Sequence, residues 1–256
     1  MLKIVLIAAL AALTVEASPR FHAGLRRLDG KIVGGADAII EDYPHQVSLE
    51  AFDRHSCGGS IIARNLILTA AHCTHNKDAQ FLNIRYGTSL RNQGGTVVAI
   101  AEIHDHPNYD PVTTDFDISV LKLSSDIDLS HTAQIIPMIS VNAQEGGRTA
   151  LVTGWGALYT DGPSPKQLQV VELKEEDRKA CNKAYEGEIT ERMICFMNPG
   201  QDACQGDSGG PLISNGVQIG VVSWGYDCAD PLYPGVFADL ANVQIRDHID
   251  GIVEMK

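Results

Sequence analysis

The chain has 256 residues, of which 44% are hydrophobic and 20% are charged, a composition typical of a folded globular protein. Its formal net charge is −12; five basic and two acidic side chains lie up to Lys31, which leaves 15 basic and 30 acidic ones in the remainder. A surface this acidic repels phosphate backbones and anionic lipids, which argues against nucleic acid or a membrane as a partner.

The first 31 residues differ from the rest. Residues 1–17, MLKIVLIAALAALTVEA, place an apolar run after Lys3 and small residues at Val15 and Ala17. This pattern is typical of a secretory signal peptide that is cleaved after Ala17. A membrane anchor, the alternative, needs about twenty apolar residues, so we expect a soluble, secreted, extracellular protein. Residues 18–31, SPRFHAGLRRLDGK, form a short basic leader that ends at Lys31.

Short β-type runs follow, many of them alternating and most of them separated by Gly, Pro, Asn or Asp. They are HQVSL (45–49), SIIARNLILTA (60–70), TVVAIAEI (96–103), DISVLKL (117–123), TALVTGW (149–155), QLQVVEL (167–173), PLISNGVQIGVVSW (211–224) and GVFADL (235–240). Asn215-Gly216 between two apolar runs is a strong signal for a two-residue hairpin turn. Many short strands at this spacing predict an all-β barrel or sandwich.

Two segments are expected to be helical. The charged stretch KEEDRKACNKA at 174–184 is one, and its acidic residues fit a solvated face. The other runs from Asn242 to Glu254, with Asn242 as an N-cap and Ile245, Ile249, Ile252 and Val253 at helical spacing.

The chain has six cysteines, Cys57, Cys73, Cys181, Cys195, Cys204 and Cys228. An even number in an oxidising compartment predicts disulfides. A metal site is the competing interpretation, but no Cys-x-x-Cys pair is present. Six cysteines allow fifteen pairings, and the residues alone do not choose among them.

The glycine-rich stretch DACQGDSGGP at 202–211 contains one serine, Ser208, and is either a hairpin turn or the presentation of a nucleophile. A serine hydroxyl becomes nucleophilic when a base removes its proton and a third group orients that base. His72 lies in LTAAHC (68–73), after an apolar strand. Asp117 begins another apolar strand, where an ionised carboxylate is costly unless it is paired, and a histidine N–H would pair it.

The other histidines have simpler interpretations. We expect polar surface or half-buried positions for His45, His55, His75, His131 and His248. His104 and His106 could share a strand face as metal ligands, but no third ligand is evident, so we predict no metal site and no cofactor.

LTAAHC, DFDISVLKL and DACQGDSGGP occur in the order His, Asp, Ser behind an Ile32-Val-Gly-Gly start. In these motifs the chain closely resembles the chymotrypsin-like serine proteases, and specifically the trypsins, from residue 32 to the C-terminal helix. The resemblance implies two packed six-stranded antiparallel β-barrels with a C-terminal helix, a protease domain at 32–256, and a catalytic cleft between the barrels. It also implies the disulfides Cys57–Cys73, Cys181–Cys195 and Cys204–Cys228, a set common among invertebrate trypsins.

The same resemblance implies the roles of the site residues. Ser208 is the nucleophile, His72 the base and then the acid, and Asp117 the residue that orients the imidazole. The backbone N–H groups of Gly206 and Ser208 form the oxyanion hole. The resemblance also implies that cleavage after Lys31, which trypsin itself could make, frees the α-amino group of Ile32. This group would pair with Asp207 and reorganise the loop that forms the oxyanion hole.

The resemblance also implies which residues select the substrate. Asp202 stands at the base of the pocket and pairs with a substrate Arg or Lys, Gly225 and Gly235 leave room for a long side chain, and Ser223-Trp224-Gly225 aligns the substrate backbone. Many trypsins have a serine at the position of Ala203, and its hydroxyl helps to hold a lysine ammonium. The absence of this hydroxyl predicts a preference for arginine over lysine. The loop at 87–95 has no Asp or Glu, so we predict no calcium site there.

The expected protein is therefore a monomeric digestive trypsin made as a zymogen, whose partners are protein or peptide substrates and protein inhibitors. Two alternatives remain. A catalytically inactive relative would act as a binding protein, although His72, Asp117 and Ser208 are all present. A regulatory or venom protease is the other, and the short leader argues against the extra N-terminal domains of many regulatory proteases.

Overall fold

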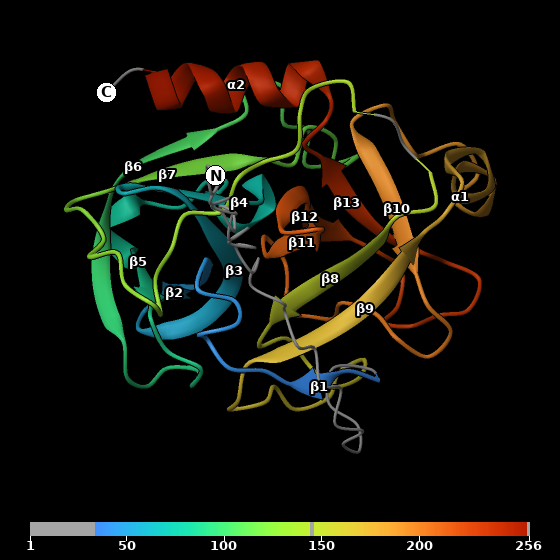
Figure 1. Ribbon diagram of the computed structural model, residues 1–256. Coiled ribbons are helices and arrows are strands. Elements are labelled where there is room, and N and C mark those ends of the chain that lie inside the picture. The colour runs from blue at the N-terminus through green and yellow to red at the C-terminus, as the bar shows by residue number, and fades with distance from the viewer. Residues whose placement is uncertain (1–33, 144–145, 255–256) are drawn as a thin grey trace, which may run out of the picture.

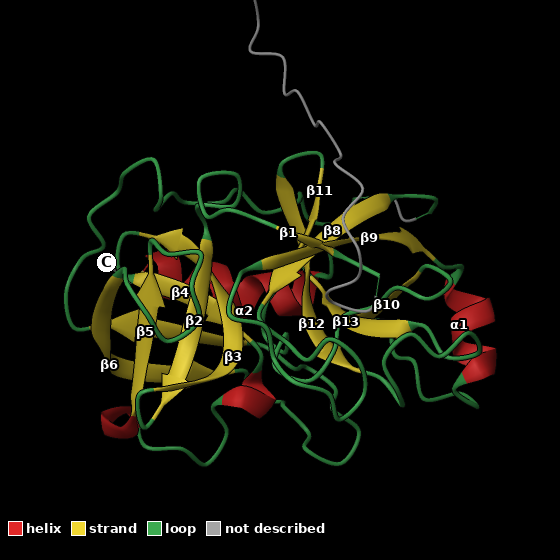
Figure 2. Cartoon of the chain, turned by 90° about the horizontal axis from the view of Figure 1, so that it is seen from below, coloured by secondary structure: helices red, strands yellow, loops and turns green. Residues whose placement is uncertain are grey.

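The computed structural model describes residues 34–143 and 146–254, and Figure 1 shows the arrangement of their strands and helices. Two groups of strands lie side by side, as the perpendicular view in Figure 2 also shows. The signal-peptide and leader predictions, with Lys31 and Ile32, lie outside the described residues. The described strands are β1 (Ala36–Asp37), β2 (Gln46–Ala51), β3 (Arg54–Ala63), β4 (Leu66–Thr69), β5 (Leu82–Tyr86), β6 (Thr96–Asp105), β7 (Ser119–Leu123), β8 (Thr149–Gly154), β9 (Gln169–Glu175), β10 (Met193–Met197), β11 (Pro211–Ser214), β12 (Val217–Trp224) and β13 (Gly235–Asp239).

The first barrel is closed by six antiparallel strands in the order β2-β3-β4-β7-β6-β5. Strand β5 buries alternate side chains: Leu82, Ile84 and Tyr86 are buried and the residues between them are half-buried. This alternation is what a strand with one face in a core requires. The barrel interior is therefore filled by side chains.

The second barrel has the strand order β9-β10-β13-β12-β11-β8 and is closed by pairing of β8 with β9. The short strand β1 adds to β9, with Ala36 opposite Val170. Two six-stranded antiparallel barrels confirm the predicted fold class.

The barrels share part of their interior. Val221 and Ala238 of the second barrel belong to the main apolar cluster of the first. Two buried hydrogen bonds also cross between the barrels: Ser60 Oγ donates to Gln218 Oε1 over 2.7 Å, and Thr153 Oγ1 donates to Gln46 Oε1 over 2.6 Å. The surface where the barrels meet is thus a packed interior with satisfied polar groups.

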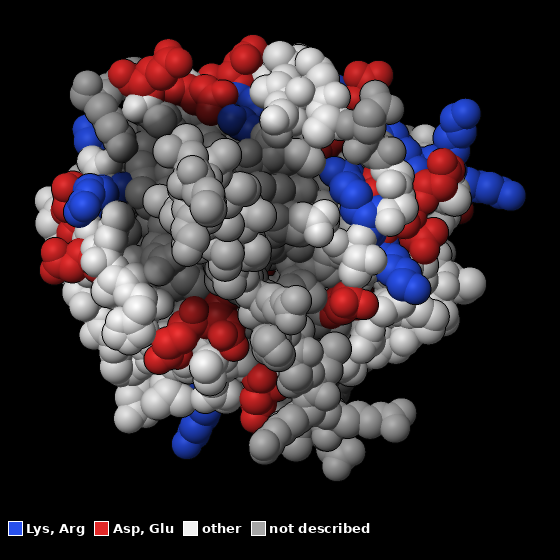
Figure 3. Space-filling model, in the orientation of Figure 1, with Lys and Arg blue, Asp and Glu red and all other residues white. Residues whose placement is uncertain are grey.

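Helix α2 (Val243–Glu254) lies across the first barrel and confirms the predicted C-terminal helix. Asn242 caps it by accepting a hydrogen bond from the Gln244 N–H over 3.0 Å. Ile245, Ile249 and Ile252 pack into the core cluster of the first barrel. Acidic side chains line the edge of the molecule that α2 occupies, where Figure 3 shows part of the net negative charge.

Two local predictions were adjusted by the structure, and a third was confirmed. The predicted helix at 174–184 begins later, since β9 continues to Glu175, Asp177 caps the N-terminus, and α1 spans Arg178–Ala184. The run at 60–70 forms two strands, β3 and β4, joined by a turn. Asn215 and Gly216 form the predicted hairpin turn, with φ angles of 50° and 79°. No helix in the described residues is long and apolar enough to cross a membrane.

Candidate active site

Three strands bring His72, Asp117 and Ser208 to one place. His72 lies in a 3-10 turn, Ala71–Cys73, shortly after β4, and Asp117 lies just before β7. Thr69 of β4 is paired with Ser119 of β7, so the two segments leave the first barrel next to one another. Ser208 lies before β11 of the second barrel and is held against β3 by a hydrogen bond from the Gly58 N–H to its carbonyl, 2.8 Å long.

Asp117 is 2% exposed, and both of its carboxylate oxygens accept hydrogen bonds. Oδ1 accepts the backbone N–H of His72 over 2.8 Å, and Oδ2 lies 2.8 Å from Nδ1 of the same residue. Ser223 Oγ also donates to Oδ2, over 2.6 Å. An acceptor at Nδ1 places the proton of the neutral ring there and leaves Nε2 free to act as a base.

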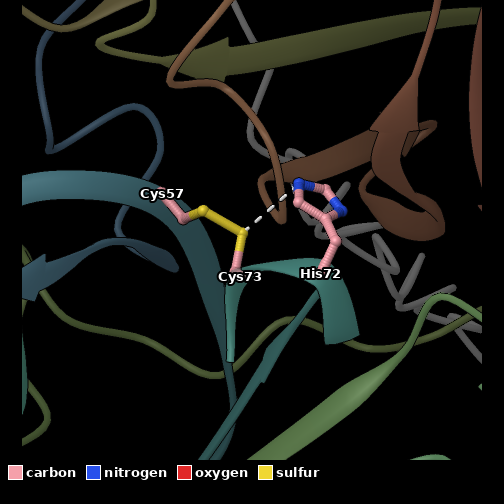
Figure 4. Close-up of side chains that lie close together, drawn as sticks. All are labelled: Cys57, His72 and Cys73. Atoms are coloured by element: carbon pink, nitrogen blue, oxygen red, sulfur yellow. Dashed lines mark hydrogen bonds between the residues drawn. A yellow bond between two sulfur atoms is a disulfide. The ribbon is translucent and has the colours of Figure 1, made fainter. Parts of the chain in front are cut away.

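Figure 4 shows the disulfide Cys57–Cys73 beside the imidazole of His72. Nε2 of His72 lies 3.6 Å from Cys73 Sγ, and among the described residues no hydrogen bond joins it to Ser208. Cys57, His72 and Cys73 are also the one group in the described chain whose possible metal ligands lie within 4.8 Å of one another. Both sulfurs are bonded to each other, so neither is available as a thiolate ligand.

A pocket opens beside Ser208, and Asp202, with 4% of its surface exposed, is one of the residues that line it. The Asp202 carboxylate accepts the N–H groups of Ala203, over 2.8 Å, and Ala229, over 3.1 Å. Burial raises the pKa of Asp202 to about 7, although these hydrogen bonds oppose the effect. Residues named in the sequence analysis that line the pocket are Asp202, Ala203, Ser208, Ser223, Trp224, Gly225 and Gly235.

The two pocket glycines differ in what they allow. A Cβ on Gly235 would lie 2.7 Å from Asp202 Oδ1, which is too close for any side chain without displacement of the carboxylate. A Cβ on Gly225 would meet no atom closer than 3.8 Å, so that glycine keeps space open for a ligand.

The trypsin family model matches residues 32–246. Trypsin alpha-4 of Lucilia cuprina is 44% identical over 218 residues, which is 84% of this chain and 85% of that protein. Hypodermin-A of Hypoderma lineatum is 43% identical over 224 residues, 86% and 87% of the two chains. The structure of neuropsin, a serine protease of mouse brain, superposes with a TM-score of 0.78 and 30% identity, covering 87% of this chain and 99% of that one.

The chain belongs to the trypsin family. It is a serine endopeptidase with the chymotrypsin-like fold. The three disulfides that the structure contains, Cys57–Cys73, Cys181–Cys195 and Cys204–Cys228, are those implied by the resemblance to this family.

Asp207 of this trypsin-family protein is fully buried next to Ser208. Its carboxylate accepts the N–H groups of Gly156, over 2.8 Å, and Cys204, over 2.9 Å. A Cβ on Gly154 or Gly156 would lie 2.2–2.3 Å from the Asp207 carboxylate, so both positions require glycine. Within the described residues no cation contacts this carboxylate, and burial raises its pKa to about 6.

His55 is half-buried, as expected, but sequence reasoning missed its contacts. Its Nε2 lies 2.9 Å from the carbonyl oxygen of Gly206, and its Nδ1 lies 2.8 Å from Ser48 Oγ. Burial lowers the pKa of His55 to about 4, so the ring is neutral, donates from Nε2 and accepts from the Ser48 hydroxyl. His55 thereby holds the Gly206 peptide, whose φ is 100°. No local motif marks His55, because its partner lies 151 residues away.

The other histidines do not form a metal site among the described residues. His104 Nε2 pairs with Glu102 over 3.1 Å, and the ring of His106 stacks on Phe116. His45, expected at the surface or half-buried, is instead buried, with 9% of its surface exposed, and burial lowers its pKa to about 4.

Proposed function

We propose that this trypsin-family protein is a secreted endopeptidase, made as a zymogen, that cleaves peptide bonds after arginine in preference to lysine. The observation that carries this proposal is the buried Asp202 carboxylate in a pocket whose lining includes Ser208. A basic side chain in the pocket would bring its own positive charge to Asp202 and place the following peptide bond at the serine.

The geometry around Asp117 supports the proposed catalytic roles. Ser208 Oγ would attack the scissile carbonyl while His72 Nε2 takes its proton and later returns it to the leaving amine. Asp117 would hold the Nδ1–H tautomer and stabilise the imidazolium through its 2.8 Å contact. The N–H groups of Gly206 and Ser208 would stabilise the oxyanion; losing one such donor typically costs about 10²–10³ in turnover.

Labelling with a fluorophosphonate probe tests these roles. After cleavage at Lys31 the wild-type protein should react, and the Ser208→Ala variant should not. Loss of endopeptidase activity in both Ser208→Ala and His72→Ala, with folding retained, is expected. Equal labelling of wild type and Ser208→Ala would refute the assignment of the nucleophile.

The preference for arginine rests on Ala203. Its N–H binds Asp202, but its side chain has no hydroxyl for a lysine ammonium. A guanidinium can engage the carboxylate with two parallel hydrogen bonds and needs no such help. The experiment compares kcat/KM on matched Arg and Lys peptides for wild type and Ala203→Ser. In Ala203→Ser the kcat/KM for the lysine peptide should rise relative to that for the arginine peptide, while Asp202→Asn should lose activity on both. An unchanged ratio of the two kcat/KM values in Ala203→Ser would refute the argument.

Activation would follow cleavage between Lys31 and Ile32. The buried Asp207 carboxylate supports this step, since no described cation neutralises it and a new α-amino group would do so. We propose residues 1–17 as signal peptide, 18–31 as activation peptide and 32–256 as the protease domain. Mass spectrometry of the active protein should give Ile32 as the first residue, and Lys31→Gln should remain inactive after incubation with wild type.

The physiological role that fits these features is digestion of dietary protein outside the cell by a monomeric protein. Its partners would be protein substrates with Arg or Lys and protein inhibitors of serine proteases. Fly trypsins among the similar proteins support this role. Localising the protein to gut lumen tests it, and restriction to a venom gland would refute it.

A further inference from the structure

The segment that leads to Asp117 has an unfavourable backbone conformation. Thr114 and Phe116 both have φ near 55°, a left-handed conformation that β-branched and bulky residues rarely adopt. Asp115 lies between them, and Asp117 follows directly. Such conformations persist only where the surrounding contacts enforce them, so the contacts of this segment determine where the Asp117 carboxylate lies.

Arg192, which directly precedes β10 of the second barrel, supplies the strongest of these contacts. Its Nη2 donates to Asp115 Oδ2 over 2.6 Å, and its Nε donates to Oδ1 over 3.2 Å. Thr190 Oγ1 donates to the same Oδ1 over 2.9 Å. Burial alone would raise the pKa of Asp115, but the hydrogen bonds from Arg192 and Thr190 hold it below its usual value. The pair is therefore ionised at neutral pH.

The guanidinium also covers the next residue. The Arg192 Cζ lies 4.7 Å from the centroid of the Phe116 ring, and the His106 ring stacks on Phe116 with centroids 4.6 Å apart. Arg192 itself is fixed, since its carbonyl accepts the N–H of Asp239 in β13 over 2.8 Å. One side chain of the second barrel thus contacts two successive residues immediately before Asp117 in the first barrel.

We infer that Arg192 is a positioning residue for the catalytic centre: by binding Asp115 and covering Phe116 it holds the strained segment 114–116 in place and so fixes the Asp117 carboxylate against His72. This inference rests on the proposed role of Asp117. Without the guanidinium the segment relaxes toward ordinary backbone angles, and the contacts of 2.8 Å that Asp117 makes with His72 lengthen. The imidazolium formed during catalysis is then less well stabilised.

The test compares Arg192→Ala with Arg148→Ala in the activated protein. Arg148 makes a matched pair that does not contact His72, Asp117 or Ser208: its Nε and Nη2 bind Glu175 over 2.8 and 2.5 Å, and its Cζ lies 6.0 Å from the Phe196 ring. Arg192→Ala should lower kcat roughly 10- to 100-fold, the scale of a small misplacement of catalytic groups. KM should change little, and Arg192→Lys should recover part of the kcat.

Two further readouts separate positioning from a loss of stability. The acid limb of the kcat/KM profile should shift in Arg192→Ala and stay in place in Arg148→Ala, because only the first change alters the contacts between Asp117 and His72. The NMR resonance of the His72 Nδ1 proton should also shift in Arg192→Ala and stay in place in Arg148→Ala. That resonance needs no turnover, so it tests the inference even if fluorophosphonate labelling refutes the proposed function.

Equal kcat, acid limb and Nδ1 resonance in the two alanine variants would overturn the inference. If Arg192→Ala does not fold, Asp115→Asn replaces it, because asparagine keeps the shape of the side chain and removes the ion pair. This variant should show smaller changes in kcat, in the acid limb and in the Nδ1 resonance. Wild-type behaviour of a folded Asp115→Asn variant would likewise overturn it.

Discussion

Replacing Asp207 by asparagine should change the way in which the stability of the uncleaved protein depends on pH. The carboxylate is fully buried, and its contacts within the described chain are N–H groups. Burial raises its pKa from 3.8 to about 6. The proposed measurement uses Ser208→Ala as the parent, so that the protein does not digest itself.

The sign follows from the two pKa values. Below about pH 4 the carboxyl group is protonated in both the folded and the unfolded chain. Between pH 4 and 6 the unfolded chain loses this proton while the folded chain keeps it, so the contribution of Asp207 to stability is lost as the pH rises. A difference of about two between the pKa values corresponds to about 3 kcal/mol at roughly 1.4 kcal/mol for each pKa unit.

Urea unfolding, followed by tryptophan fluorescence at several pH values between about 4 and 8, measures this contribution. The free energy of unfolding of Asp207→Asn relative to the parent should rise by about 3 kcal/mol across this range. Any cost of placing an amide beside the two N–H groups is independent of pH and cancels in the comparison. Glu175→Gln is the control, because contacts with Arg148 hold the pKa of Glu175 below its ordinary value of 4.5 despite burial. Its contribution to stability changes only below that value, so the relative stability of Glu175→Gln should stay nearly constant over most of this range.

A relative stability of Asp207→Asn that stays constant from pH 4 to 8 would refute this reasoning. Cleavage after Lys31 gives a second comparison. If the new α-amino group pairs with Asp207, the carboxylate becomes ionised in the folded protein. The rise with pH in the relative free energy of unfolding of Asp207→Asn should then disappear.

Three other predictions concern separate parts of the molecule. Gly235→Ala should raise KM for arginine substrates severalfold in steady-state assays, because its Cβ would lie 2.7 Å from Asp202 Oδ1; an unchanged KM would contradict the assigned pocket. Ile249→Ala should lower the free energy of unfolding by about 2–5 kcal/mol in urea titrations, since this side chain of α2 is fully buried; a loss below 1 kcal/mol would contradict its place in the core. EDTA should leave the melting temperature unchanged, because the loop at 87–95 lacks carboxylates, and a large drop would reveal a calcium site.

The parts of the site predicted from the sequence are those that depend on short motifs. The segment 202–211 has a distinctive sequence, because the proposed nucleophile, a tight turn and the pocket residue Asp202 lie within ten positions of one another. Alternation and turn residues likewise predicted most strands, including the hairpin at Asn215. The segment at 193–197 was not among the predicted strands; four of its five residues are buried, so it shows no alternation.

Contacts between distant segments left no such signal. Arg192 meets Asp115 across 77 residues, and His55 meets Gly206 across 151. Each looks like an ordinary polar residue in its own neighbourhood, and only the closure of two barrels against each other gives it a partner. Helix α1 shows the same limit on a smaller scale, because pairing of β9 with β10 keeps residues 174 and 175 in a strand.

The interior shared by the two barrels has a consequence for the lifetime of a protein that cuts proteins. Val221 and Ala238 complete the core of the first barrel. The hydrogen bonds Ser60–Gln218 and Thr153–Gln46 would break if the barrels separated. Opening one barrel would therefore destabilise the other, which favours opening of the two barrels together. A partly open molecule would offer its exposed chain to its neighbours as substrate, and digestion of that state follows its population. Cooperative unfolding keeps this population small, so the shared core protects the enzyme from itself.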